Sequence, residues 1–244
     1  MIDKVLLQEY AAEYGVTVDT QAAERFDRYA QLLVEWNERM NLTAITQPND
    51  IVLKHFADSL TVIPLLPEKQ GFSLIDVGTG AGFPGIPLAI VRGDMQLTLL
   101  DSLNKRLTFL QQVCTELGIQ AQLIHARAEE GGRKPQLRES FDVVTARAVA
   151  ALPVLVEYCL PFLKKGGRFI AMKGPDSDAE LEQASRAVTM LGGTVTEVKN
   201  LVLPVTPRAG VEEQERRLFL IDKTTQTPSR FPRQSAKISK EPLR

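Results

Sequence analysis

This sequence is poor in the two residue types from which most metal and redox sites are built. It has two cysteines, Cys114 and Cys159, and two histidines among 244 residues. Two cysteines inside separate helical patterns do not indicate a disulfide framework, and no CxxC or Cys/His cluster has the spacing of a zinc site. We therefore expect two buried thiols, a reducing compartment and no bound metal.

A long uninterrupted apolar run is also lacking. The stretch 74–91 carries a single charge, but its glycines together with Pro84 and Pro87 make it a poor membrane helix. The first four residues do not lead into the apolar segment typical of a signal peptide. We therefore expect a cytoplasmic protein that does not bind a membrane.

The sequence also lacks an excess of charge of either sign. Lysine and arginine number 29 against 30 acidic residues, so the overall charge does not indicate a nucleic-acid-binding protein. The charge is uneven, however, because residues 224–244 carry five basic residues and one acidic residue. This basic C-terminal tail suggests a polyanion partner or a solvated, partly disordered terminus, and charge alone leaves both interpretations open.

Two kinds of sequence pattern divide the rest of the chain. Residues 1–67 carry apolar residues at helical spacing, a break at 41–46 and a helix start at Pro48, which predicts a helical extension. Residues 68–223 alternate strand and helix patterns, which predicts a largely parallel sheet covered on both faces. The predicted strands are 73–77, 96–100, 121–125, 141–146, 167–172, 194–203 and 215–222.

The last two predicted strands follow one another without a helix between them, which predicts an antiparallel hairpin at the edge of the sheet. The predicted helices of this part are 86–92, 103–117, 152–163 and 178–191. The fold class is therefore α/β and Rossmann-like, a mainly parallel seven-stranded sheet with a C-terminal hairpin. This layout is typical of class I methyltransferases that use S-adenosylmethionine (SAM).

A glycine-rich turn follows the first predicted strand. Gly78, Gly80 and Gly82 form a GxGxG spacing, whereas the dinucleotide fingerprint GxGxxG would need its third glycine where Phe83 stands. Such a turn lets a nucleotide-like ligand lie against bare backbone at a helix N-terminus, although a tight turn without a ligand has the same pattern. Asp76 precedes the first glycine by two residues and suits the ammonium group of SAM.

Acidic residues follow the next two strands, where the ligands of parallel sheets bind. Asp101 ends the second strand and is placed to bind two ribose hydroxyls, to cap the next helix, or both. A dehydrogenase would also have this acid, so Asp101 indicates that adenosine binds but does not identify the cofactor. After the third strand, the backbone of Ala128 and the side chain of Glu129 are candidates for the adenine edge, or part of a solvated acidic loop.

Basic residues follow the fourth and fifth strands, where class I methyltransferases present the methyl acceptor. Arg147 suits a phosphate, a carboxylate or guanine, or forms a structural ion pair. Lys173 lines the acceptor cleft or belongs to a strand end marked by glycine and proline. The motifs for amino-group methylation of adenine or cytosine and for covalent attack on a pyrimidine are both missing.

Both histidines are weak candidates for catalysis. His55, Asp58 and Ser59 share one helical face, which resembles a hydrolytic triad in spacing only. A serine in the middle of a helix lacks a strained turn and oxyanion donors, so hydrolysis is a poor hypothesis. His125 ends a strand and is expected to be a packing or loop residue.

Taken together, the chain resembles the glucose-inhibited division protein B family, bacterial guanine-N7 methyltransferases of small-subunit ribosomal RNA. The run 76–85 with Phe83-Pro84 is the most specific match. Weaker matches cover most of the chain in the family's order: Met40-Asn41-Leu42-Thr43, His55 with Asp58-Ser59-Leu60, Asp101-Ser102 with Lys105-Arg106, Ala128-Glu129, Ala146-Arg147-Ala148, Phe231-Pro232-Arg233 and Pro242-Leu243.

The resemblance implies SAM as cofactor and 16S ribosomal RNA, or the small ribosomal subunit, as partner. It implies that SAM is contacted by Gly78, Phe83, Ala128, Glu129 and Arg147, with Asp101 on the ribose. Guanine N7 has a lone pair and no proton, so its methylation needs no general base. The candidates for RNA contact are the basic tail, Lys105, Arg106, Arg147 and Lys173.

Three other hypotheses stay open on the sequence. An NAD(P)-dependent oxidoreductase could use the same sheet, a non-catalytic module could bind SAM or RNA without transfer, and a methyltransferase could act on a small molecule. The oxidoreductase would be expected to have a glycine at position 83 and a hydride-transfer site, and neither is visible.

Overall fold

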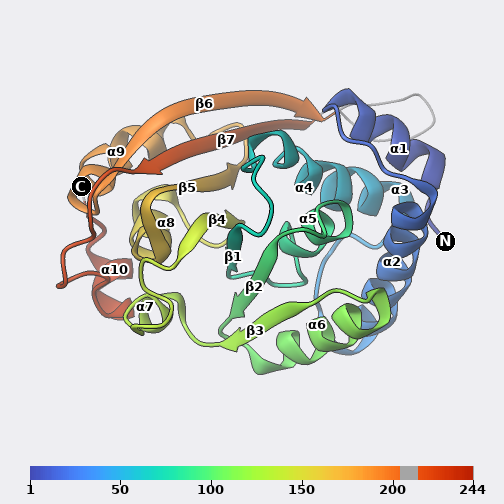
Figure 1. Ribbon diagram of the computed structural model, residues 1–244, viewed down its shortest axis with the longest axis horizontal. Coiled ribbons are helices and arrows are strands. Elements are labelled where there is room, and N and C mark those ends of the chain that lie inside the picture. The colour runs from blue at the N-terminus through green and yellow to red at the C-terminus, as the bar shows by residue number, and fades with distance from the viewer. Residues whose placement is uncertain (204–213, 244) are drawn as a thin grey trace.

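A twisted seven-stranded sheet runs through the molecule in the computed structural model, which describes residues 1–203 and 214–243 (Figure 1). Its spatial order is β3-β2-β1-β4-β5-β7-β6. The strands are β1 Ser73–Val77, β2 Gln96–Asp101, β3 Ala121–His125, β4 Phe141–Arg147, β5 Leu163–Lys173, β6 Gly193–Leu203 and β7 Gln214–Lys223.

The first five strands pair in parallel, and β7 pairs antiparallel with both β5 and β6. The predicted α/β fold with a terminal hairpin is therefore confirmed, and β7 lies inside the edge that β6 forms. β1 and β4 lie side by side at the point where the strand order reverses direction. The chain runs outward from β1 to β2 and β3 on one side, and from β4 to β5 on the other. Crevices at such a switch point bind the ligands of open α/β sheets.

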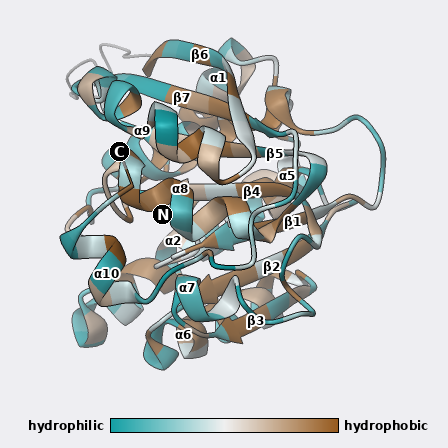
Figure 2. Ribbon diagram, turned by 90° about the vertical axis from the view of Figure 1, so that its left-hand side faces the viewer, coloured by the Kyte–Doolittle hydropathy of each residue, from teal (hydrophilic) through white to brown (hydrophobic). Residues whose placement is uncertain are grey.

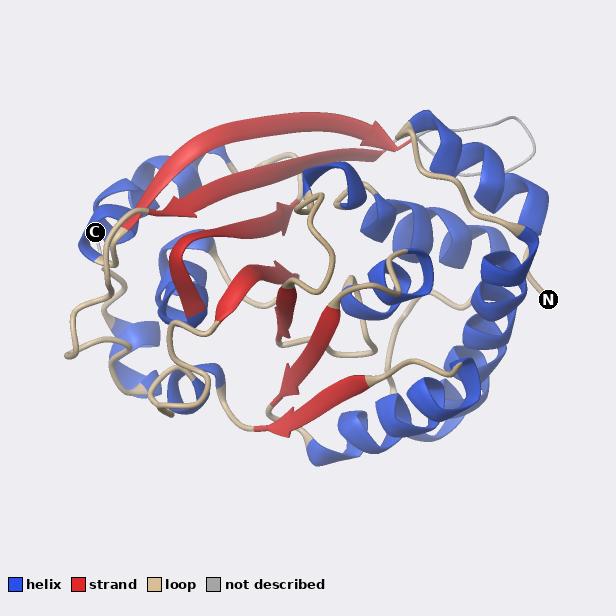
Figure 3. Cartoon of the chain, viewed as in Figure 1, coloured by secondary structure: helices blue, strands red, loops and turns tan. Residues whose placement is uncertain are grey.

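Helices cover both faces of the sheet, as Figure 3 shows with strands in red between two groups of blue helices. One group contains α1 Lys4–Glu13, α2 Thr20–Met40, α3 Pro48–Ile51, the π-helical turn η1 Val52–Ala57, α4 Asp58–Leu60, the 3-10 turn η2 Ile63–Leu65, α5 Gly85–Val91 and α6 Asn104–Leu117. The other contains α7 Ala128–Gly131, α8 Leu152–Cys159, the 3-10 turn η3 Leu160–Phe162, α9 Asp178–Met190 and α10 Ser235–Lys240.

Local sequence explains how the N-terminal helices begin and end. The Asp19 carboxylate accepts a hydrogen bond from the Ala22 amide at 2.7 Å and caps α2. Asn41 ends α2 in the left-handed conformation at φ 47°, and Pro48 occupies the first turn of α3. The helix break and the helix start that the sequence predicted at these positions are confirmed.

Two hydrophobic clusters hold the layers together. The larger cluster joins the N-terminal helices, α5 and α6 to one face of the sheet, and the smaller one joins α8 and α9 to the other. Neighbouring residues of β1 divide between them, with Leu74 in the first cluster and Ile75 in the second, because side chains alternate along a strand. In Figure 2 the apolar colour is concentrated on the central strands.

The C-terminal tail is folded onto the domain. Phe231 and Ile238 are buried, and α10 forms within the tail. The interpretation of the tail as a partly disordered terminus is wrong for residues 224–243, and Arg244 lies outside the described residues. Both cysteines are buried and free, as predicted. Among the described helices, none is long and apolar enough to cross a membrane.

Candidate cofactor and acceptor site

The glycine turn between β1 and α5 has the backbone that its sequence predicted. Gly78, Gly80 and Gly82 have φ values of 68°, 60° and 101°, a region that side chains other than glycine rarely adopt. A Cβ built on Gly80 would meet only the Gly78 carbonyl oxygen at 3.9 Å. Gly80 therefore presents uncovered backbone at the carboxyl edge of the sheet.

The other two glycines serve close packing within the protein. A Cβ on Gly78 would lie 2.7 Å from Val149, and one on Gly82 would lie 2.7 Å from the Tyr29 hydroxyl. The Tyr29 hydroxyl also donates a hydrogen bond to the Ala81 carbonyl. The structure thus gives Gly82 a role in seating α2 on the turn, where the sequence alone had pointed to the cofactor.

Asp76 is fully buried beneath the turn. Its carboxylate accepts hydrogen bonds from the Thr79 hydroxyl at 2.7 Å, the Gly85 amide at 3.1 Å and the Thr145 hydroxyl at 2.9 Å. Burial raises the pKa of this carboxyl, while these hydrogen bonds favour its charged form. The geometry makes Asp76 a brace between β1, β4 and the start of α5, and it is not among the residues that line the cavities below.

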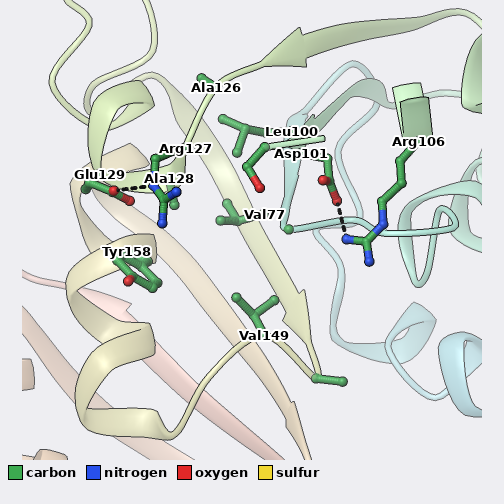
Figure 4. Close-up of a pocket in the computed structure, with 13 residues that line it drawn as sticks. Val77, Leu100, Asp101, Arg106, Ala126, Arg127, Ala128, Glu129, Val149 and Tyr158 are labelled. Carbon is green, nitrogen blue, oxygen red and sulfur yellow. Dashed lines mark hydrogen bonds and ion pairs between the residues drawn. The ribbon is translucent and has the colours of Figure 1, made fainter. Parts of the chain in front are cut away.

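A first cavity of about 320 Å³ opens beside the turn, at the ends of β1, β2 and β3 (Figure 4). Such a volume lies at the lower end of the range of about 300–1,000 Å³ that is usual for small-molecule sites. Gly78, Asp101, Ala128 and Glu129, all predicted to bind the cofactor, line it. The remaining lining residues are Val77, Leu100, Ser102, Arg106, Ala126, Arg127, Ala148, Val149 and Tyr158.

Asp101 connects this cavity to the glycine turn. Its Oδ2 accepts a hydrogen bond from the Gly80 amide at 2.9 Å, and its Oδ1 accepts one from the Leu103 amide at 2.8 Å. Arg106 Nη1 lies 3.3 Å from Oδ2. Only 1% of Asp101 is exposed, so its backbone partners hold the carboxylate in one place. The prediction that Asp101 caps the next helix is wrong: α6 begins after Leu103 without a side-chain cap, and at that end Asp101 binds only the amide of Leu103 itself, while it lines the cavity as expected.

A second cavity of about 340 Å³ adjoins the first, since Ala148 lines both. Ala148 has a φ of 56°, an uncommon conformation for a residue with a Cβ and one that tends to occur at functional sites. Arg147 and Lys173, the predicted acceptor residues, both line this cavity. The other lining residues are Ile45, Lys54, His55, Asp58, Met172, Gly174 and Arg216.

A buried carboxylate organises the cations of the second cavity. Asp58 is 3% exposed, and its two oxygens take the two arginines separately. Oδ2 lies 2.8 Å from Arg147 Nη1, and Oδ1 lies 3.0 Å from Arg216 Nε. Lys173 Nζ pairs with Glu180 at 2.7 Å and donates to the Ala150 carbonyl at 3.0 Å. The arginines are thus fixed at the cavity by a group from the N-terminal extension.

His55 and Phe83 form the floor beneath Arg147. The two rings stack with centroids 4.3 Å apart and planes 16° apart, and the Arg147 guanidinium lies 4.9 Å from the Phe83 ring centre. His55 Nδ1 lies 3.2 Å from Arg147 Nη2, and Nε2 lies 2.9 Å from the Thr43 hydroxyl. Burial and then the Arg147 charge lower the pKa of His55 to about 3, so the ring is neutral. Phe83 supports Arg147 and does not line the first cavity.

The hydrolytic interpretation of His55, Asp58 and Ser59 finds no support in these contacts. The Ser59 hydroxyl donates to the His55 backbone carbonyl at 2.5 Å, one turn back in its own segment, and is fully buried. His125 Nε2 contacts the Ser102 carbonyl at 3.0 Å, which agrees with a loop role. Within residues 1–203 and 214–243, no group of three His, Cys, Asp or Glu residues is arranged to hold a metal ion.

Sequence reasoning missed the roles of two lining residues. The sequence places Asp58 in a triad-like pattern and in one of the weaker family matches, and neither predicts a role at the second cavity. Arg216 lies in the polar first part of β7, Gln214–Arg217, where an arginine needs no ligand to explain it. Nothing local shows that β7 brings Arg216 next to Asp58, which is 158 residues earlier in the chain.

The fold and the two adjoining cavities define a class I methyltransferase dependent on SAM. Solved structures of similar fold include an S-adenosylmethionine-dependent O-methyltransferase from Thermotoga maritima, with a TM-score of 0.51, 18% identity and coverage of 80% of this chain and 72% of that one. A branched-chain polyamine synthase variant from Thermus thermophilus gives a TM-score of 0.57 at 15% identity, covering 82% of this chain and 65% of that one. At these identities the likeness concerns the fold.

The chain belongs to the rRNA small subunit methyltransferase G family, whose model matches residues 22–207. Relatives with the name ribosomal RNA small subunit methyltransferase G include one from Alkaliphilus metalliredigens, 45% identical over the whole of both chains. Another from Staphylococcus aureus is 47% identical over 97% of each chain. The predicted family is therefore confirmed, and this membership favours a methyltransferase over the NAD(P)-dependent oxidoreductase.

Proposed function

We propose that this protein transfers a methyl group from SAM to N7 of a guanine in 16S ribosomal RNA, as free RNA or in the small ribosomal subunit. SAM binds in the first cavity, and the guanine enters the second. The observation that carries this proposal is the junction at Ala148, where an adenosine-type cavity meets a cationic one. A ribosomal RNA substrate also supports a place in the cytoplasm.

The first cavity fits SAM through its own residues. The carboxylate of Asp101, held by the Gly80 and Leu103 amides, is suited to the ribose hydroxyls. Ala128 and Glu129 begin α7, just after β3, where an adenine edge would meet them. When bound, SAM supplies a methyl group on a positively charged sulfur. The open backbone at Gly80 leaves room for close approach of the ligand.

The second cavity suits an acceptor that loses no proton. Its two possible proton acceptors, His55 and Asp58, are both engaged, His55 with Arg147 and Thr43 and Asp58 with two arginines. Guanine N7 needs no base, so the protein's task is to orient the base, which can contribute about 7–11 kcal/mol. Arg147 and Arg216 carry donors that match a phosphate or the acceptor atoms of guanine.

RNA must present the guanine unstacked, because the deep, narrow major groove of an A-form helix hides N7. The cations that line the second cavity are each paired with an acid, including Lys54 with Asp50 at 2.8 Å. Arg106, at the first cavity, and the exposed Lys105 beside it extend the basic surface. Their contacts with phosphates would make RNA binding fall steeply with salt.

Methyl transfer tests the proposal directly. The protein is incubated with radiolabelled SAM and either bulk ribosomal RNA or small subunits from cells that lack the enzyme, and the labelled base is mapped. We expect label in one guanine of 16S RNA, at N7. Label on another base or another atom would contradict the proposal, and so would SAM binding without any transfer.

An Asp58→Asn variant separates the two cavities. The amide cannot balance the charges of both arginines, so we expect methyl transfer to fall by at least about tenfold, corresponding to about 1.4 kcal/mol, while SAM affinity stays unchanged. Asp50→Asn, which alters only the pair with Lys54, is the matched control and should retain most activity. Equal losses in the two variants would place Asp58 outside the acceptor machinery.

A further inference from the structure

The C-terminal segment 231–240 lies behind one wall of the first cavity. Figure 1 shows α10 beside α7, which is the short helix that carries Ala128 and Glu129 to the cavity. The end of α7 packs tightly on this segment, because a Cβ built on Gly132 would lie 3.3 Å from Pro232. With four residues, α7 is too short to be stable alone, so it depends on what packs against it.

The Arg127 guanidinium connects the tail to Glu129, which lines the first cavity. Arg127 Nε donates to Glu129 Oε1 at 2.9 Å, and Arg127 Nη2 donates to the Ser235 hydroxyl at 3.2 Å (Figure 4 shows the contact with Glu129). Glu129 is 6% exposed, whereas Arg127 is on the surface. Arg127 therefore occupies one oxygen of Glu129, which leaves Oε2 available to a ligand.

An ion pair between Arg233 and Glu157 anchors the tail close to the first cavity. Arg233 pairs with Glu157, whose carboxylate is completely buried, through Nη2 at 2.7 Å and Nε at 3.0 Å. The Arg233 amide also donates to Glu157 Oε1 at 2.7 Å. Glu157 precedes Tyr158, which lines the first cavity. The charge of Arg233 is thus used inside the protein and is not available to a polyanion.

We infer that the tail is a positioning element of the cofactor cavity, acting through Ser235, Arg127 and Glu129. It keeps Glu129 turned into the cavity and so contributes to SAM affinity, independently of any contact with RNA. The inference depends on the proposed placement of SAM in the first cavity. Because binding and structure are linked reciprocally, SAM should in turn protect α10.

Calorimetric titration of SAM against single variants of the full-length chain tests this role. We expect Arg127→Ala to raise the Kd for SAM about fivefold or more and Ser235→Ala about twofold to threefold, close to the smallest effect typical of the loss of one hydrogen bond. Adding Ser235→Ala to Arg127→Ala should have no further effect, since both act through one contact. Ser239→Ala, an exposed position on the same helix, is the matched control.

Stability and hydrogen exchange distinguish positioning from a general structural role. The melting temperature of the cofactor-free variants should stay close to that of the parent, and SAM should slow exchange of the Ile238 and Glu241 amides, which hydrogen-bond within the tail. A lower melting temperature with an unchanged Kd would overturn the inference. So would a Kd that Ser235→Ala leaves unchanged, or that Ser239→Ala alters equally.

Asp101→Ala serves as the reference for the cavity itself. If Asp101→Ala raises the Kd and Arg127→Ala does not, the inference about the tail fails while the placement of SAM stands. If none of these substitutions changes the Kd, SAM does not bind in the first cavity, and the proposed placement fails together with the inference.

Discussion

At the scale of single residues, the carboxylates of this protein act first as braces for backbone. Asp76 binds the turn that follows β1, and Asp101 binds the amides of Gly80 and Leu103. A buried carboxylate that accepts several hydrogen bonds holds its neighbours firmly, because leaving those donors unpaired is costly. The same rigidity fixes the cavity wall before a ligand arrives.

The first residue-scale prediction concerns Asp101. Asp101→Ala should weaken SAM binding by about 1–3 kcal/mol, because it removes a ligand acceptor and leaves the Gly80 and Leu103 amides without their partner. Titration calorimetry measures the change. Asp94→Ala, just before the opposite end of β2, is the control and should leave the Kd near that of the parent; a similar loss in both would indicate general misfolding.

The second concerns His55 and pH. Its folded pKa of about 3 lies below the ordinary value of 6.5, chiefly because of burial. Between these values the unfolded chain binds a proton that the folded chain does not, so stability falls as pH falls from 6.5 towards 3. Replacing His55 by glutamine should flatten this slope by up to about 1.4 kcal/mol per pH unit.

Urea unfolding at pH 6.5, 5.8 and 5.0 measures that slope where most carboxylates are still ionised. If the parent and the His55→Gln variant lose stability in parallel over this interval, then His55 is not held neutral in the folded protein.

At the scale of elements, the glycine turn is a joint between the sheet and the N-terminal helices. The Tyr29 hydroxyl from α2 binds the Ala81 carbonyl, and the rings of Tyr29, Phe56 and Phe83 pack together. Hydrogen bonds to Asp76 on one side and to Tyr29 of α2 on the other therefore hold the turn in place. Rigid support of this kind is what a site needs if it is to be formed in advance.

Two glycines of this turn should respond differently to alanine. Gly80→Ala should destabilise the fold by about 1–2 kcal/mol, the cost of a left-handed residue with a Cβ. Gly82→Ala should cost about 1–3 kcal/mol more than Gly80→Ala, because its Cβ would also lie within 3 Å of Tyr29, Ile86 and Leu110. Urea titration compares the free energies of unfolding. A larger loss for Gly80→Ala would contradict the packing described for α2.

At the scale of the whole molecule, the helical extension and the sheet share one hydrophobic cluster. The side chains of α1, α2 and η1 belong to the same buried cluster as those of α5, α6 and the sheet, and α2 packs on α5 and α6. The single tryptophan, Trp36, donates to Gln112 of α6 at 3.0 Å and reports on this interface. The sequence boundary near residue 67 thus marks a change of pattern within one continuous core.

We accordingly predict one cooperative unfolding transition. Trp36 fluorescence and far-ultraviolet circular dichroism should change together in urea, as in two-state unfolding. A fragment that starts at residue 68 should bind a hydrophobic dye and lack a cooperative transition, because it leaves the apolar sides of α5 and α6 uncovered. Two separate transitions in the full chain, or a cooperatively folded fragment, would show that the extension is an independent unit.

Local sequence determined the elements of the fold and much of the first cavity. Alternating strand and helix patterns predicted the strands, and glycine spacing predicted the turn. Asp101, Ala128 and Glu129 lie in the cavity because parallel strands end at the same edge. Such signals are local, since each depends on the chemistry of a few neighbouring residues. The same logic predicted that Arg147 and Lys173 lie together at the ends of the next strands, and both line the second cavity.

Only the tertiary structure decided the partners of these residues. It buried the Asp76 carboxylate beneath the turn, packed Gly82 against Tyr29, and stacked Phe83 on His55. It brought Asp58, Arg147 and Arg216 together from three distant segments of the chain. It also folded the basic tail against α7 and α8, where Glu157 neutralises Arg233. The physical reason is that an ion pair or a stacked ring depends on distance in space, and no spacing along the chain records which residues will meet.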